Sequence, residues 1–286
     1  MKAKEAASPP WLLRAARGIA RESADLAARV WRARVLLVAV TRVEIQKKYS
    51  GAILGLLWYP LYSGLLLAMY CFIYMVVFPA RSGDPSFGAY DHVLTIFAGL
   101  IPYLGFSEAV STGATSIKGN IALVKNTVFP VELIPVKQVL VALASLSVSL
   151  AILIALILPT RHMGWHLLYL PVPILFLAAF CAGVVWILAA LAVLVPDINY
   201  AVNLLLLFFL FVSPIGFTVS QIPPSAAVFV YLNPMTYLTE SFRFALLGMR
   251  DVPMWLDAVF GAALLMFLAA SGAFFRRLMP LFGDYE

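Results

Sequence analysis

Charge is scarce in this sequence, since Asp, Glu, Lys and Arg make up 12% of its 286 residues. Soluble domains carry about 25% charged residues. Hydrophobic residues make up 63% of the chain, which is more than one compact core could hide from water. The composition therefore excludes an ordinary soluble domain and indicates a chain in a lipid bilayer. At about 20 residues per helical crossing, the apolar stretches supply roughly six crossings.

Residues that carry chemistry are also few. The two cysteines, Cys71 and Cys181, lie in apolar runs, where we interpret them as small buried hydrophobic residues rather than disulfide or metal partners. The three histidines, His92, His162 and His166, fall at predicted outer helix ends without a cluster of carboxylates. The phosphate-binding pattern of ATPases and the G-x-S-x-G pattern of hydrolases do not occur. We expect no catalytic residue, metal or cofactor in this chain, and nothing in its sequence supports catalysis.

Stretches poor in charge predict an all-α integral membrane protein with six transmembrane helices. The predicted crossings are residues 51–80, 92–116, 138–158, 167–195, 201–220 and 255–275. Together they form a predicted transmembrane domain over residues 50–286. Residues 23–49 are basic and partly amphipathic, and their longest apolar run is too short to cross. They predict a helix in the headgroup plane, anchored by Trp31. Residues 1–22 form a polar N-terminal extension to which we assign no role.

Residues 221–250 are apolar enough for another crossing but contain prolines and charges. Asn233 followed by Pro234 predicts an N-cap and a proline in the first helical turn, and Gly248 predicts the matching stop. We therefore expect two short helices, at about 225–232 and 234–247. Neither is long enough to cross, so a re-entrant hairpin between the fifth and sixth crossings is predicted.

The distribution of positive charge sets the expected orientation. Eleven of the 20 Lys and Arg residues lie between Lys2 and Lys48. Such a basic end could bind nucleic acid, but Lys and Arg also gather on the cytoplasmic side of membrane proteins, and we favour this second interpretation. Six crossings with a cytoplasmic N-terminus place 16 of these residues inside and 4 outside, whereas a seventh would move Arg276 and Arg277 outside. Both termini are therefore predicted to be cytoplasmic.

Two crossings carry polar and aromatic residues on one face. At 100° per residue, the first groups its members within an arc of about 120° and the fifth within about 100°. In the first crossing these are Tyr59, Tyr62, Ser63, Tyr70 and Tyr74, and in the fifth Asn199, Asn203, Ser213, Pro214 and Phe217. One interpretation is hydrogen bonding between helices. The other is a pathway for a sugar chain, whose C–H faces stack on aromatic rings while its hydroxyls reach Tyr and Asn.

Glu108 is the one carboxylate well inside a predicted crossing, which makes it a candidate for function. A structural interpretation is an ion pair with a basic residue of segment 23–49, such as Arg42 or Lys47, because an unpaired buried charge is costly. Glu240 and Arg243 have the i,i+3 spacing of a pair on one short helix.

The order and spacing of several segments over residues 40–280 resemble the permease subunits of type-2 ABC exporters. These segments are residues 44–58, 99–102, 119–125, 129–135 and 233–236. The resemblance is strongest to the branch that exports O-antigen, capsule or teichoic-acid polymers. It implies a homodimer of six-span subunits in the bacterial inner membrane, with two cytoplasmic ABC ATPase subunits that bind ATP and magnesium. It also implies a lipid-linked polysaccharide as substrate.

The resemblance also assigns roles to particular residues. It implies a coupling loop over residues 117–135, which contacts the ATPase through Lys118, Gly119, Asn120, Leu123, Lys125 and Asn126. It implies a gate helix in segment 23–49, where we expect Arg42, Lys47 and Lys48 to attract the lipid pyrophosphate. The hairpin over residues 221–250 would form an outer gate that includes Asn233, Pro234, Glu240 and Arg243, and the first and fifth crossings would line the channel.

Two alternative functions fit the sequence less well. A type-2 ABC exporter of a small drug or lipid often has a large extracytoplasmic domain, and no predicted outer loop is long enough for one. An integral-membrane glycosyltransferase or acyltransferase needs an acid or histidine placed for chemistry in a loop, and none is evident. Polysaccharide export is therefore the function that the sequence favours.

Overall fold

The computed structural model describes residues 25–26, 28–48, 58–77, 89–120, 130–195, 197–223, 225 and 227–283. Among these residues there are helices and connecting segments but no strands, so the prediction of an all-α protein is confirmed. The α-helices are α2 (Arg34–Lys48), α3 (Trp58–Cys71), α4 (Ala89–Ala114), α5 (Ser116–Gly119), α7 (Leu133–Ile157), α8 (Pro171–Leu194), α9 (Ile198–Val212), α10 (Ala227–Leu232), α11 (Pro234–Leu247) and α12 (Trp255–Leu278). Shorter helical turns are η2 (Phe72–Val77), η3 (Trp165–Tyr169), η4 (Val219–Gln221) and η5 (Met279–Gly283).

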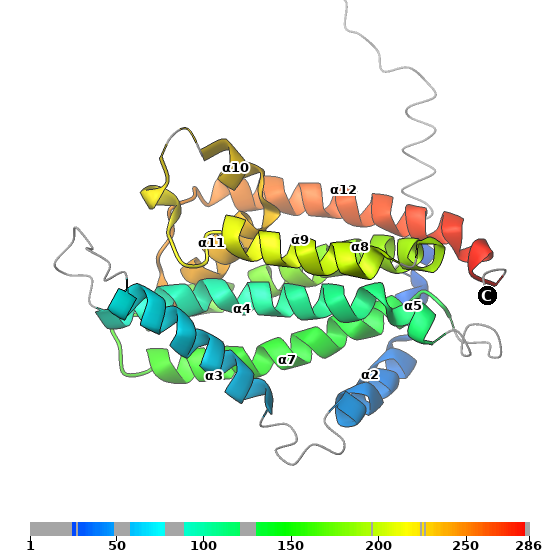
Figure 1. The fold of residues 1–286 in the computed structure, drawn as a ribbon, viewed down its shortest axis with the longest axis horizontal. Helices are drawn as coiled ribbons and strands as arrows, with labels where there is room; N and C mark the ends of the chain where they lie inside the picture. The colour runs from blue at the N-terminus through cyan, green and yellow to red at the C-terminus, as the bar shows by residue number, and fades with distance from the viewer. Residues whose placement is uncertain are drawn as a thin grey trace, which may run out of the picture.

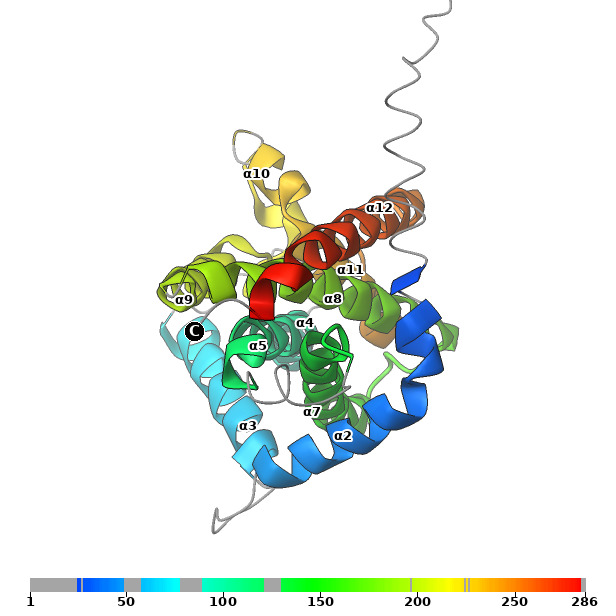
Figure 2. The ribbon, with the colours of Figure 1, turned by 90° about the vertical axis from the view of Figure 1, so that its right-hand side faces the viewer.

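Helix α4 is the centre of the bundle. The other helices surround it, and Figure 2 shows it end-on between α3, α7, α8 and α9. In the most apolar 18-residue stretch of α4, 83% of the residues are buried inside the protein. The corresponding share in the other long apolar helices is 33% to 44%. Its apolar side chains, among them Leu94, Phe97 and Leu100, therefore pack against protein rather than lipid.

Four helical stretches in the described part of the chain are long and apolar enough to cross a membrane. They are Tyr90–Ala114, Leu133–Ile157, Trp165–Leu194 and Trp255–Phe282. Helix α3 has 14 residues before the π-helical η2, and α9 has 15 residues. Both are shorter than the roughly 20 residues of a typical crossing. The structure thus supports a multi-pass membrane protein with four such helices, and the predicted first and fifth crossings overlap α3–η2 and α9.

Two predicted helix boundaries were wrong, and a proline explains each. The fifth crossing was expected to stay helical to residue 220, but α9 ends at Val212. Ser213 is extended because the α conformation is disfavoured before a proline, here Pro214. The third crossing was expected to begin at residue 138, but α7 begins at Leu133. Pro135 is accommodated there because it lies in the first turn, where the backbone N–H has no helical partner.

The paired short helices predicted for residues 221–250 are present as α10 and α11. Asn233 Oδ1 accepts a hydrogen bond from the Met235 N–H at 2.9 Å, and Gly248 ends α11 with a φ of 70°. Both capping predictions are confirmed. Helix α11 is mostly buried against α4, η3 and α8, whereas Val230 is the buried residue of α10.

The helical segment that precedes α2 packs at the end of the bundle where α12 ends, shown on the right in Figure 1. Leu26 is buried against Trp186 and Phe275, and Asp25 lies 3.6 Å from the Arg276 guanidinium. Helix α2 then crosses this end next to α7 (Figure 2). This is the end at which the sequence predicts the cytoplasm.

Candidate functional site

One face of α2 attaches this helix to the bundle. Leu37, Thr41, Glu44 and Lys48 follow one another at three- and four-residue intervals, which places them on a single stripe of an α-helix. Leu37 and Thr41 are buried, and Glu44 Oε2 accepts a hydrogen bond from Lys137 Nζ of α7 at 2.9 Å. The position of α2 is therefore set by a mixed stripe with a charged end.

The Glu44–Lys137 contact makes the attachment of α2 dependent on pH. Burial by itself raises the pKa of Glu44, but hydrogen bonds from Lys137 and Gln138 and the positive charges of Lys137 and Lys47 outweigh it and bring the pKa below the ordinary 4.5. A lowered carboxyl pKa contributes stability that is present above pH 4.5 and is lost as the pH falls through the folded-state pKa.

Glu44→Gln is therefore expected to lower the melting temperature of the detergent-solubilised protein at neutral pH and to lose this effect in acid. The two proteins should converge only once the pH has fallen below the folded-state pKa of Glu44, which is itself below 4.5, because native Glu44 is then protonated as well. Thermal unfolding measured across this pH range checks the prediction. A difference that stays constant with pH would contradict it.

Glu108 of α4 is paired with the last residue of α2. Lys48 Nζ donates a hydrogen bond to Glu108 Oε1, and Ser145 Oγ of α7 donates to the same oxygen at 3.0 Å. The prediction of an ion pair with segment 23–49 is confirmed, but the partner is Lys48 instead of Arg42 or Lys47. At 100° per residue, Arg42 points about 140° away from Leu37, so it leaves the face of α2 that meets the bundle.

Two cavities adjoin this ion pair. The first has a volume of about 340 Å³ and is lined by Trp58 and Tyr62 of α3 together with Ser107 of α4. The second has a volume of about 520 Å³ and is lined by Lys47 and Gln138, among others. Lys48 and Glu108 line both cavities. An aromatic space and a polar space thus meet at one charged pair.

The predicted channel face of the first crossing is divided in the structure. Tyr62 is 58% exposed and faces the first cavity. Ser63 is fully buried, and its Oγ lies 3.1 Å from Ser149 Oγ of α7. Ser63 therefore takes part in hydrogen bonding between helices, which was one of the two interpretations of this face, and it is not among the described residues that line the first cavity. The side chains of Tyr59, Tyr70 and Tyr74 lie outside the described residues.

The set predicted on the fifth crossing does not share one helical face, because α9 ends before three of its five members. Asn199 and Asn203 are on α9, and Asn203 is exposed. Asn199 Oδ1 is buried without a hydrogen-bond partner among the described residues. Ser213 is buried and accepts a hydrogen bond from Asn233 Nδ2 at 3.1 Å. Phe217 lies beyond the helix.

The part of the predicted coupling segment that the structure describes begins in α5. Lys118 and Gly119 are exposed on this four-residue helix, whereas Ile117 is fully buried. Asn120 follows, and its Nδ2 donates a hydrogen bond to the Ser116 carbonyl at 2.8 Å. Leu123, Lys125 and Asn126 lie outside the described residues. Helix α5 follows α4 after a single turn residue, so it is connected almost directly to the helix that carries Glu108.

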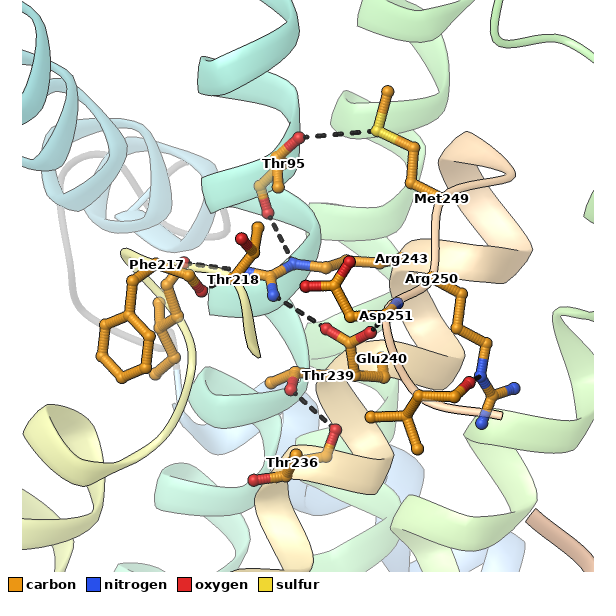
Figure 3. A network of polar contacts seen from close by, with 12 residues as sticks. Thr95, Phe217, Thr218, Thr236, Thr239, Glu240, Arg243, Met249, Arg250 and Asp251 are labelled. Atoms are coloured by element: carbon orange, nitrogen blue, oxygen red, sulfur yellow. Dashed lines mark hydrogen bonds and ion pairs between the residues drawn. The ribbon is translucent and has the colours of Figure 1, made fainter. Parts of the chain in front are cut away.

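Two of the predicted outer-gate residues, Glu240 and Arg243, belong to a buried network, seen in Figure 3. Arg243 Nη1 donates to Glu240 Oε1 at 3.0 Å, and the two side chains are 3% and 1% exposed. Arg243 also donates to the carbonyls of Thr95, Ile215 and Phe217 at 3.3, 3.0 and 3.2 Å. Thr95 is on α4, whereas Ile215 and Phe217 follow the end of α9, so Arg243 joins both of these segments to α11.

A second polar cluster at this end was missed by sequence reasoning. The Asp257 carboxylate of α12 accepts hydrogen bonds from Arg250, Ser241 and Tyr169, the first to both oxygens. Burial by itself lowers the pKa of Arg250, but the hydrogen bonds and charge of Asp257 outweigh it and raise the pKa. The sequence did contain one indication of this cluster, because Asp257 is an acid in the first turn of a predicted crossing. No group of three or more His, Cys, Asp or Glu suited to a metal occurs within the described residues.

A helical bundle with several membrane-length helices and a basic end defines a multi-pass membrane protein. Residues 35–247 match the sequence profile of the family described as ABC-2 type transporter. The match covers most of the chain, and the protein belongs to the ABC-2 type transporter family.

Three relatives in this family share one name. Over 213 residues, the chain is 30% identical to the O-antigen export system permease protein RfbA of Myxococcus xanthus, covering 73% of this chain and 79% of the relative. Over 214 residues, it is 25% identical to a protein of the same name from Klebsiella pneumoniae, covering 73% and 78%. A second Klebsiella pneumoniae protein of that name is 24% identical over 214 residues, with the same coverage.

Proposed function

We propose that this chain is the membrane permease of an ATP-driven exporter. Its substrate would be a lipid-linked polysaccharide, such as O-antigen or capsule, carried from the cytoplasmic side across the bacterial inner membrane. Three relatives named as O-antigen export permeases support the substrate class. The observation that carries the proposal in this structure is a cavity where the ring of Tyr62 faces a charged pair, Lys48 and Glu108. The apolar ring faces of a glycan would stack on Tyr62, and the lipid diphosphate joined to the glycan would bind Lys48.

The proposed assembly is a homodimer of six-span subunits with two cytoplasmic ABC ATPase subunits, which bind ATP and Mg²⁺. Helices α3–η2 and α9 would supply the two crossings beyond the four long helices. The outer side of α9 is suited to contact a second subunit or lipid, because its exposed apolar residues recur at helical spacing. These residues are Tyr200, Leu204, Phe208 and Phe211. Both chain termini would lie in the cytoplasm, and the α10–α11 hairpin would enter the membrane from the opposite side.

The remaining predicted residues have places in this proposal. Lys47 and Lys48 would attract the diphosphate at the second cavity, with Arg42 contributing from the exposed side of α2. Lys118, Gly119 and Asn120 would contact the ATPase, together with the coupling residues further along the loop. The glycan would pass along the tyrosines of α3, where rings tolerate sliding because stacking lacks the strict geometry of hydrogen bonds.

Tyr62→Ala combined with Tyr70→Ala is expected to reduce surface polysaccharide by about tenfold, since two stacking surfaces are removed. Export is measured in cells that contain the partner ATPase, by staining surface polymer and by extracting the intracellular lipid-linked form. The intracellular form should accumulate as the surface form disappears.

The matched control is Tyr62→Phe with Tyr70→Phe, which keeps both rings and removes both hydroxyls. This variant should retain most export if stacking is the main interaction. Full export by the double alanine variant would remove the tyrosines from the pathway. An unchanged polymer distribution in cells that lack the permease would contradict polysaccharide export itself.

A further inference from the structure

The Lys48–Glu108 ion pair separates the aromatic cavity from the polar one. Both cavities are lined by these two residues, and the pair joins the end of α2 to the C-terminal part of α4. We propose that this pair is a latch opened by an anionic headgroup. A phosphate group in the polar cavity would replace Glu108 as the partner of Lys48. The inference rests on the proposed function, because it takes the diphosphate of a lipid-linked glycan as the anion.

The polar cavity has the charge that a phosphate needs. Of its two acids, Glu44 already has a counter-ion, since Lys137 Nζ lies 2.9 Å from its carboxylate. Glu108 balances Lys48, and Lys47 adds a further positive charge to the lining. Lysine is a common phosphate ligand, and charge-assisted hydrogen bonds are stronger than neutral ones.

The pair is also exposed enough to exchange partners. Its side chains are 33% and 14% exposed for Lys48 and Glu108, against 3% and 1% for Arg243 and Glu240. Ion pairs that water can reach contribute little stability, whereas separating a deeply buried pair is costly. Glu108 would keep the Ser145 hydroxyl as a hydrogen-bond donor after losing Lys48, because Ser145 Oγ lies 3.0 Å from its Oε1.

An anion in this cavity would also touch the segment that leads to the ATPase. Gly119 and Asn120 line the cavity together with the two lysines. Helix α4, which carries Glu108, leads into α5 through a single turn residue. Opening of the latch would therefore free one end of α2 and place the bound headgroup against α5. ATP hydrolysis by the partner should then rise when a diphosphate occupies the site.

The test uses the permease together with its ATPase partner in lipid nanodiscs. ATP hydrolysis is measured against the concentration of a polyprenyl diphosphate, with the uncharged polyprenol and inorganic pyrophosphate as parallel probes. Glu108→Gln should lower the half-stimulating concentration of polyprenyl diphosphate by about three- to tenfold, because Lys48 loses its competing partner. Lys48→Gln should raise it by about tenfold, and Lys48→Arg should keep it close to native.

The matched control is Arg34→Gln, which removes a positive charge from the other end of α2. Arg34 is not among the described residues that line either cavity, so this variant should respond like the native complex. Equal effects of Arg34→Gln and Lys48→Gln would show general attraction to a basic surface and overturn the latch. So would a shift in the same direction for Glu108→Gln and Lys48→Gln, or the absence of stimulation in the native complex.

The parallel probes separate the sources of the anion. Stimulation by polyprenyl diphosphate alone supports a lipid headgroup, whereas equal stimulation by inorganic pyrophosphate would overturn it in favour of a free anion. The proposed function is tested separately in the cell-based export assay. It would be contradicted if cells without the permease had normal surface polysaccharide. If those cells lose export and the Glu108 and Lys48 variants still respond like the native complex, only the latch is wrong.

Discussion

Arg243→Met is expected to destabilise the protein by about 3–5 kcal/mol, the usual cost of removing one partner from a buried ion pair. The substitution leaves the Glu240 carboxylate, which is 1% exposed, without its cation. It also removes the shared donor to the carbonyls of Thr95, Ile215 and Phe217. Thermal unfolding in detergent and the yield of monodisperse protein measure the loss.

The double variant Glu240→Gln with Arg243→Met separates the charge from the packing. It should be more stable than Arg243→Met alone, because no unpaired carboxylate remains buried. A surface comparison is Asp25→Asn, since the Asp25 side chain is 70% exposed and lies 3.6 Å from Arg276, whose side chain is 26% exposed. That variant should lose less than about 1 kcal/mol. A similarly small loss for Arg243→Met would contradict a structural role for the buried pair.

Features that depend on neighbouring residues were predictable from the sequence. The boundary between α10 and α11 follows from Asn233 and Pro234, and the end of α11 follows from Gly248, because capping and a positive φ are decided within one turn. Prolines were harder to interpret. Pro135 lies in the first turn of α7, where proline is tolerated, whereas Pro214 follows the end of α9, and the sequence alone does not show at which end of a helix a proline falls.

The sequence predicted which residues belong to the candidate site, but it did not predict which of them contact one another. Glu108 stands out in the sequence as an acid in an apolar run, yet its partner depends on how α2 is rotated against α7. Ser63 and Tyr62 are neighbours in the sequence, but they point about 100° apart on a helix. One therefore reaches α7 and the other faces a cavity.

The Asp257 cluster was out of reach for a related reason. Its donors come from α11, from the segment after α11 and from η3, up to 88 residues away in the chain. The sequence shows each polar residue but does not show that one carboxylate gathers them. Only the packing of these separate segments brings the donors to Asp257.

Gly113→Ala is expected to destabilise the protein by about 1–3 kcal/mol through overpacking between α4 and α8. A Cβ at this position would lie 2.3 Å from Val185 Cγ1 and 3.1 Å from Val185 Cβ. Val185 is fully buried, and because its second methyl carbon, Cγ2, would also lie only 2.7 Å away, the side chain or one of the two helices must shift. Small residues allow membrane helices to approach closely, and here the closeness fixes α4, which carries Glu108 and leads into α5.

Adding Val185→Ala to Gly113→Ala removes the clashing methyl groups. The double variant should therefore be more stable than Gly113→Ala alone, although each substitution by itself is destabilising. Gly64→Ala is the matched control on α3, because no described atom lies within 4 Å of the position that its new Cβ would take. Its stability should change little or increase slightly, as alanine favours helix over glycine. The prediction is tested by the melting temperatures of the native protein, Gly113→Ala, the double variant with Val185→Ala, and Gly64→Ala. If Gly113→Ala were as stable as Gly64→Ala, the contact between α4 and α8 would be looser than this structure shows, and α4 could not connect Glu108 rigidly to α5.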